Sequence, residues 1–149
     1  ALWSNPFTKG PVQSAGYILN AGSEQFIQDC VHKLQQDHAA SLLIFPEGTR
    51  TAKGEQLNDF QRGAANIALR AGVPIRPVLI SCTPSTLTKN EKWYHIPEQP
   101  FHIHVKVLDA IRVEDVLDDV TVNPKNVRQL NQQLQWFFNQ ELSLNEQSC

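Results

Sequence analysis

The sequence predicts an α/β domain, in which a mixed, largely parallel sheet is flanked by helices, as a single unit over residues 1–149. Apolar runs of strand length alternate with segments of helical periodicity through most of the chain. The run "SLLIF" (41–45) is continuously apolar after its serine, which is typical of a strand covered on both faces in a parallel sheet. The composition, 41% hydrophobic and 19% charged, is that of an ordinary globular domain.

The first part of the chain predicts a strand, a helix and a second strand. Residues 14–20 form a short strand-like segment after a loop that contains Pro and Gly. In 22–38 apolar residues recur on one helical face, and Ser23 is placed to cap the helix. The run 41–45 predicts a buried strand that ends at Phe45.

The middle of the chain predicts a second helix and a third strand. The Ala-rich segment 60–72 has helical character, and Gly72 is a natural left-handed cap for its end. The segment 73–81 reads as a strand. Because Pro77 removes one ladder donor from it, an edge or a bulge is expected there.

The last part predicts a loop, a strand and a helix. The stretch 83–100 is a long polar loop. In 101–108 apolar and polar residues alternate strictly, which is typical of a strand with one covered face and one exposed face. Asn123 and Pro124 stand in the order of an N-cap and a first helical residue, and they open a helix over 123–142.

Charge and cysteine content argue against several classes of protein. The formal net charge of -2 argues against a nucleic-acid partner that is bound by phosphate neutralisation. Cys30, Cys82 and Cys149 are too few and too scattered for a disulfide framework or a zinc site, so we expect no metal and a reducing, cytoplasmic environment. No segment resembles a signal peptide or a membrane span. The start "ALWSNPF" indicates a fragment.

The segment "LLIFPEGTR" (42–50) passes from apolar to charged residues without a spacer. In α/β sheets ligands bind at the carboxyl ends of strands, where these polar residues are expected. Gly48 permits a close backbone approach or a positive φ, Glu47 and Thr49 can bond hydroxyls, and the forked guanidinium of Arg50 matches a phosphate. The alternative is a polar turn with a solvated arginine, and spacing alone does not separate the two.

The residues "FPEGTR" (45–50) resemble the third motif of the glycerolipid acyltransferase family, which includes the 1-acylglycerol-3-phosphate acyltransferases. Two later segments agree in order and spacing. "FQRGAANIALRAG" (60–72) is similar to the family's helix that begins Phe-basic-basic-Gly-Ala, and "GVPIRPV" (72–78) resembles its fourth motif. The resemblance covers residues 14–81, and the remaining tail is generic.

The resemblance implies an O-acyltransferase of phospholipid biosynthesis. Such enzymes transfer a fatty acyl group from acyl-CoA or acyl-carrier protein to a hydroxyl of a lysophospholipid or related acceptor. They act with peripheral contact at the cytoplasmic face of a membrane, and the acyl donor is a co-substrate, so no cofactor is implied. Glu47, Gly48, Thr49 and Arg50 would form the acceptor or phosphate site, with help from Arg62. The wall near the acyl chain would be formed by Val73, Pro74, Ile75, Pro77 and Val78.

The family's catalytic His-x-x-x-x-Asp motif, whose His is the general base, is expected before residue 1. We therefore assign no catalytic residue here and expect the chain alone to be inactive. "HKLQQD" (32–37) has the right spelling, but on one helix its two ends point about 140° apart, so His32 and Asp37 are interpreted as solvated surface residues.

Other candidates are weaker, and one family position is altered. In the family's second motif, Gly-x-x-x-x-Arg, this chain has Ala21 where the arginine stands, which leaves the acceptor open. His102 and His104 share a strand face but lack a third ligand, and His95 lies in an aromatic loop that could contact an acyl chain or simply pack. Cys82 is interpreted as a small apolar residue rather than a nucleophile.

Three alternatives to this function remain open. A degenerate relative could keep the acceptor pocket and bind lipid without transfer, or the acceptor could lack a phosphate. A different phosphate-ester enzyme is less favoured, because the chain has neither a glycine-rich phosphate loop nor a carboxylate cluster for Mg²⁺.

Overall fold

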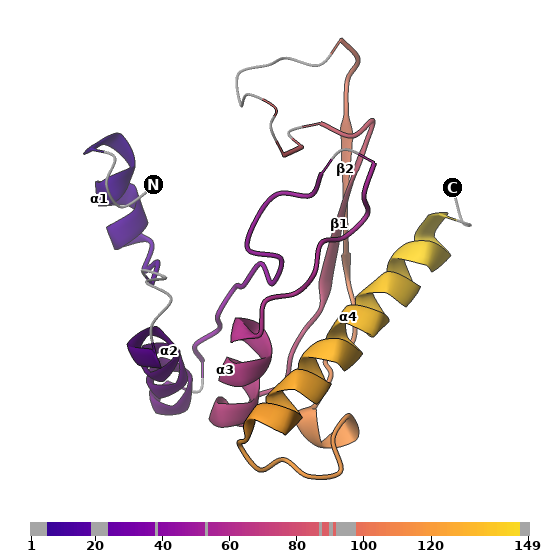
Figure 1. Cartoon of the computed structure of the whole chain (residues 1–149). Helices are drawn as coiled ribbons and strands as arrows, with labels where there is room; N and C mark the ends of the chain where they lie inside the picture. Colours follow the sequence, from indigo (N-terminus) through magenta and orange to yellow (C-terminus); the bar gives the residue numbers. More distant parts are fainter. Residues whose placement is uncertain are drawn as a thin grey trace. The chain divides into compact units, whose positions relative to one another are not determined.

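The computed structural model describes residues 6–18, 24–37, 39–52, 54–86, 88–89, 91 and 98–146. The chain divides into two compact units, Ala1–Leu42 and Leu43–Cys149. In Figure 1 the first unit runs from indigo to purple, and the second continues from purple to yellow.

The first unit contains two helices, α1 (Pro6–Ser14) and α2 (Glu24–Gln36). The predicted amphipathic helix is confirmed as α2: Cys30 is buried on its inner face and Glu24 lies in its first turn. The expected cap, Ser23, lies outside the described residues.

The strand predicted over 14–20 is wrong in its described part. Ser14 is the last residue of α1, and Gly16 follows it with a left-handed φ of 70°. A glycine in this conformation ends a helix, and Tyr17 beyond it has an exposed side chain. Apolar content alone suggested a strand, although the segment has no sheet neighbour in the described structure.

The second unit contains α3 (Gly63–Ala71), β1 (Val78–Thr83), β2 (His102–Val107), the short 3-10 helix η2 (Val113–Asp115) and α4 (Pro124–Glu146). β1 and β2 pair antiparallel, with Val78 opposite Val107 and Thr83 opposite His102. Figure 1 shows this ladder with α4 beside it. An isolated bridge between Ile75 and Ile111 extends the pairing beyond Pro77.

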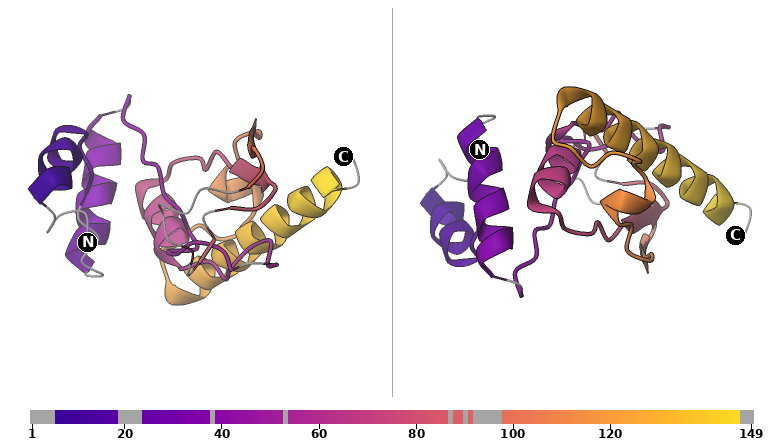
Figure 2. Two further views of the ribbon diagram at one scale, coloured as in Figure 1. Left: turned by 90° about the horizontal axis from the view of Figure 1, so that it is seen from above. Right: turned by 90° about the horizontal axis from the view of Figure 1, so that it is seen from below.

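The core of the second unit lies where α3 meets α4. Leu130 is completely buried, and the neighbouring side chains of both helices are nearly so. The ring of Phe60 packs edge-on against Phe138 of α4, with 5.2 Å between centroids. Figure 2 shows α3 and the first half of α4 adjacent from two further directions. The buried cluster consists of Phe60, Ala65, Ala68, Leu69, Val113, Leu117, Val127, Leu130 and Leu134.

The predicted helix ends are largely confirmed. Gly72 caps α3 with φ 65°, and its N–H donates to the carbonyl of Ala68. The side chain of Asn123 accepts a 2.8 Å hydrogen bond from the N–H of Asn126, which is the geometry of an N-cap. The last helix thus starts where Asn123 and Pro124 predicted.

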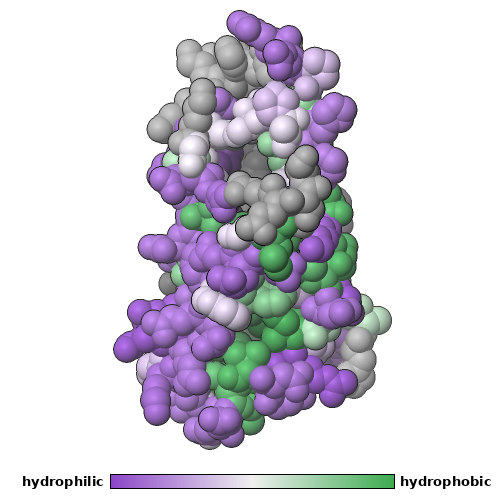
Figure 3. Space-filling view, turned by 90° about the vertical axis from the view of Figure 1, so that its right-hand side faces the viewer, coloured by the Kyte–Doolittle hydropathy of each residue, from purple (hydrophilic) through white to green (hydrophobic). Residues whose placement is uncertain are grey.

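The strand predicted over 101–108 is confirmed as β2, although β2 is not half-covered. The strand predicted over 73–81 is confirmed only in its last part, because β1 begins at Val78. Opposed residues of an antiparallel pair share a face, so Ile80 and Val105 lie together, and their side chains are 56% and 61% exposed. The other face carries buried Leu79, and Lys106 pairs there with Glu141 of α4 at 3.2 Å. Figure 3 shows hydrophobic side chains exposed among hydrophilic ones on one side of the molecule.

The largely parallel sheet is not found in the described residues, whose sheet is two-stranded and antiparallel. The run 41–45, predicted as a buried strand, has no strand partner there, and Leu43 and Phe45 are 77% and 68% exposed. A strand requires a neighbour to pair its N–H and C=O groups, and an apolar run does not specify that neighbour. The fold is therefore a mixture of helices and a small sheet.

Candidate functional site

The Pro46–Arg50 segment forms a tight turn in the second unit. The N–H of Gly48 donates to the carbonyl of Phe45 at 3.1 Å, and Gly48 has the positive φ, 68°, that its identity suggested. A Cβ at this position would lie 3.4 Å from Cγ of Gln61. The N–H of Gln61 in turn donates to the carbonyl of Pro46 at 2.7 Å. The turn is therefore held against the chain that leads into α3.

The carboxylate of Glu47 links the turn to a distant segment. Its Oε2 accepts a 2.8 Å hydrogen bond from the backbone N–H of Asn58 and a 3.1 Å bond from the hydroxyl of Thr51. Asn58 also donates its side-chain amide to the carbonyl of Arg50 at 3.3 Å. Glu47 thus fixes the shape of the motif, in addition to any bond its other oxygen makes to a ligand.

Two side-chain amides of α4 form hydrogen bonds to the backbone of Asn58 and Phe60. Oε1 of Gln135 accepts from the N–H of Phe60 at 2.6 Å, and its Nε2 donates to the carbonyl of Asn58 at 3.1 Å. Nδ2 of Asn131, one helical turn earlier, donates to the carbonyl of Phe60 at 3.0 Å. The sequence pattern of the last helix assigned neither residue to the site. The spacing of four between two amides was the signal that could have identified them.

The side chain of Arg50 is exposed and is oriented by a second turn. Its Nη1 donates to the carbonyl of Glu91 at 3.3 Å. The N–H of Lys89 donates to the carbonyl of Thr51 at 2.9 Å, so Lys89 and Glu91 are bonded to Arg50 and to the residue that follows it. Thr49, between Gly48 and Arg50, is also exposed.

Arg62 is exposed and occupies the N-cap position of α3, where its carbonyl accepts from the N–H of Asn66. It directly follows Gln61, which is bonded to Pro46 of the motif. The structure therefore brings the backbone of Arg62 near the turn. A ligand shared by Arg62 and Arg50 stays a prediction.

The five residues predicted as an acyl-chain wall differ in exposure. Pro77 is fully buried, and Ile75 packs against the core cluster while it bridges to Ile111. Val73 and Val78 are half-buried, and Pro74 is exposed. Two of the five thus belong to the interior of the second unit, and their role toward an acyl chain remains a prediction.

The other sequence candidates lie apart from this turn in the chain. His32 and Asp37 are both exposed, as predicted, and Asp37 follows the end of α2. His102 and His104 are exposed on β2, and no three metal-ligating side chains gather within the described residues. Sγ of Cys82, half-buried, contacts the carbonyl of Pro84 at 3.5 Å. Ala21 and His95 lie outside the described residues.

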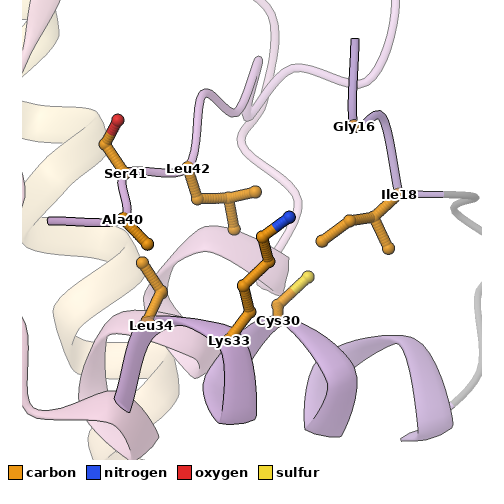
Figure 4. Close-up of a pocket in the computed structure, with 8 residues that line it drawn as sticks. All are labelled: Gly16, Ile18, Cys30, Lys33, Leu34, Ala40, Ser41 and Leu42. Atoms are coloured by element: carbon orange, nitrogen blue, oxygen red, sulfur yellow. The ribbon is translucent and has the colours of Figure 1, made fainter. Parts of the chain in front are cut away.

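A small cavity lies within the first unit. Its volume of about 40 Å³ has room for water and is too small for a lipid headgroup. Burial, with a smaller contribution from Asp29, raises the pKa of the Cys30 thiol, so that residue is an unreactive packing group. Figure 4 shows Lys33 extending across the lining, which consists of Gly16, Ile18, Cys30, Lys33, Leu34, Ala40, Ser41 and Leu42.

Known proteins resemble the part of the chain that contains the Pro46–Arg50 turn. The sequence model of the family described as Acyltransferase matches residues 14–81. Mouse 1-acyl-sn-glycerol-3-phosphate acyltransferase alpha is 36% identical over 86 residues, which are 57% of this chain and 29% of the mouse protein. The 1-acyl-sn-glycerol-3-phosphate acyltransferase of Escherichia coli (strain K12) is 46% identical over 50 residues, 34% of this chain and 20% of that protein. Residues 14–81 of this chain are therefore similar to the Acyltransferase family, and the relatives matched are 1-acyl-sn-glycerol-3-phosphate acyltransferases.

A third relative shows the same partial coverage. The 1-acyl-sn-glycerol-3-phosphate acyltransferase of Cocos nucifera is 37% identical over 75 residues, which are 50% of this chain and 23% of the coconut protein. The chain spans about a quarter of the length of these relatives. No solved structure matches it. Among the described helices none is long and apolar enough to cross a membrane.

Proposed function

We propose that this chain forms the acceptor-binding part of a glycerolipid O-acyltransferase. The reaction transfers a fatty acyl group from acyl-CoA or acyl-carrier protein to a lysophospholipid such as 1-acylglycerol-3-phosphate. The observation that carries this proposal is the "FPEGTR" turn, which lies inside the family match and is held in one shape by Glu47, with the exposed Arg50 beside it.

The chemistry requires no group beyond two substrates and a base. The acceptor hydroxyl oxygen attacks the thioester carbonyl, an ester C–O bond forms, and the C–S bond breaks. The hydroxyl proton passes to a general base, which in the family pattern is a histidine, and then to the departing thiolate. In this account Glu47 and Arg50 hold the acceptor in place and do not exchange protons, so their contribution is to positioning.

Recognition of a phosphate rests on Arg50. A guanidinium presents its N–H donors in a planar fork that fits two phosphate oxygens at once. The bond from Nη1 to the carbonyl of Glu91 restricts the rotation of this side chain, which lowers the entropy lost when a ligand is bound. Arg62 follows Gln61, whose N–H bonds to Pro46 of the motif, and it supplies a second positive charge in the same region.

A second candidate is an acyltransferase whose acceptor lacks a phosphate. It is favoured by Ala21, which stands where the family's second motif has a phosphate-binding arginine. A relative that binds a lipid without acyl transfer is the third possibility. Peripheral contact with the cytoplasmic face of a membrane belongs to the leading proposal, because its acceptor is a membrane lipid.

The test is an acyl-transfer assay of the full-length protein. Acyl-CoA and acyl-carrier protein are supplied in turn with 1-acylglycerol-3-phosphate, neutral lysophospholipids and a non-glycerol alcohol. The proposal expects the highest kcat/KM with the phosphorylated acceptor. Preference for an uncharged acceptor would support the second candidate, and absence of transfer with retained lipid binding would support the third.

A further inference from the structure

The hydroxyl of Thr88 is buried without a hydrogen-bond partner. Only 8% of the residue is exposed, and Oγ1 bonds to no atom of the residues that the structure describes. Burying a hydroxyl in this way is unfavourable, so in native proteins such a group is usually satisfied by a ligand or a water. It is the one buried polar side-chain atom in the described part of the chain that is left in this state.

Thr88 belongs to the turn that contacts the "FPEGTR" motif. The N–H of Thr88 donates to the carboxylate of Glu91 at 2.8 Å, and the N–H of Glu91 donates to the carbonyl of Thr88 at 3.1 Å. These two bonds close the turn. From the same turn, Lys89 bonds to Thr51 and the carbonyl of Glu91 accepts from Arg50. The backbone that carries the unpartnered hydroxyl is thus fixed, and it is hydrogen-bonded to Arg50, the residue proposed to bind the phosphate.

We propose that Thr88 is a binding residue of the acceptor site, and that its hydroxyl donates a hydrogen bond to a headgroup oxygen of the phosphorylated acceptor held at Arg50. This inference rests on the proposed function and extends it to a loop that the sequence marks only as polar. A hydroxyl can donate to a phosphate oxygen and accept from a glycerol hydroxyl, and both belong to the same headgroup. The acceptor would then be held by Arg50 of the motif and by the hydroxyl of Thr88.

A purely structural role predicts the opposite behaviour of a variant. If the hydroxyl bonds only a trapped water or nothing, replacing it with a methyl group removes an unfavourable burial and leaves ligand binding unchanged. If it bonds the acceptor, the same replacement weakens acceptor binding and leaves the unliganded protein as stable as before, or more stable. Binding and stability measured together therefore separate the two roles.

The experiment is calorimetric titration of the full-length protein with 1-acylglycerol-3-phosphate in detergent micelles, without acyl donor. Thr88→Val should bind about tenfold more weakly than wild type, as expected for the loss of a bond to a charged group, and Thr88→Ser should stay within about twofold. Thr86→Val, half-buried in the same loop, is the matched control and should bind normally. The thermal midpoint of unliganded Thr88→Val should equal or exceed that of wild type.

Equal binding by Thr88→Val and wild type would overturn the inference and leave a water as the partner. A lowered thermal midpoint that accounts for weaker binding would overturn it in favour of a structural role. Failure of the wild-type protein to bind the phosphorylated acceptor would instead contradict the proposed function on which the inference rests.

Discussion

Replacing Gln135 with Ala should loosen the acceptor turn from a distance. Gln135 bonds the N–H of Phe60 at 2.6 Å and the carbonyl of Asn58 at 3.1 Å, and Phe60 is only 7% exposed, so water has little access to its N–H. Each lost bond costs about 1 kcal/mol, and an unpaired buried N–H adds to this, which gives a total of about 2 to 3 kcal/mol. The better helix propensity of Ala recovers only about 0.4 kcal/mol.

The measurement is urea denaturation of the purified full-length protein, in which the free energy of unfolding is obtained by linear extrapolation. Gln133→Ala is the matched control, because it is the same substitution at an exposed position of the same helix. Since Asn58 carries the N–H that bonds Glu47, Gln135→Ala should also raise the acceptor KM. Equal stability and equal KM in the two variants would show that the α4 amides do not support the turn.

Three further changes test the frame around the site. Leu130→Ala, at a fully buried position between α3 and α4, should cost about 3 kcal/mol in denaturation, and a cost below that of a typical surface change would contradict the assigned core. Asn123→Ala removes the cap of α4 and should cost about 1 kcal/mol by the same method. Hydrogen bonds from Thr121, and then from Asn126, lower the pKa of Asp119 below its ordinary 3.8. This carboxylate therefore stabilises the fold above pH 3.8 and loses that contribution as the pH falls through its lowered pKa. Asp119→Asn should weaken the fall of the thermal midpoint at acidic pH. An unchanged fall would show that the Asp119 carboxylate does not contribute to stability.

Local signals in the sequence were sufficient for three of the four described α-helices; α1 (Pro6–Ser14) was missed, because its Pro and Gly residues suggested a loop. The periodic apolar face of α2, the left-handed glycine after α3 and the Asn-Pro pair before α4 act over a few residues, and the structure shows all three helices where they indicated. Strand pairing depends on distant partners. The segments 14–20 and 41–45 were apolar enough for strands, but composition does not state which neighbour completes the hydrogen bonds.

In the candidate site, too, local features could be inferred from the sequence and contacts between distant residues could not. The positive φ of Gly48 was one of two conformational roles that the sequence allowed for this glycine, since a Pro-x-Gly turn is a local property. The bonds from Gln135 to Phe60 and Asn58 join residues 75 and 77 positions apart, so the spacing of the α4 amides could mark Gln135 but not its partners. Glu47 was assigned to a ligand, and the structure adds that one of its oxygens fixes the backbone of Asn58. The buried hydroxyl of Thr88 follows from packing, which composition does not reveal.

The most direct test of the acceptor site is the steady-state kinetics of Arg50→Lys in the full-length protein, with each substrate varied in turn. Lys keeps the charge and loses the fork, so the acceptor KM for 1-acylglycerol-3-phosphate should rise about tenfold while the donor KM stays unchanged. Arg128→Lys, an exposed residue of α4, is the control and should behave as wild type. Unchanged acceptor kinetics in Arg50→Lys would contradict phosphate recognition by this turn and favour an acceptor without a phosphate.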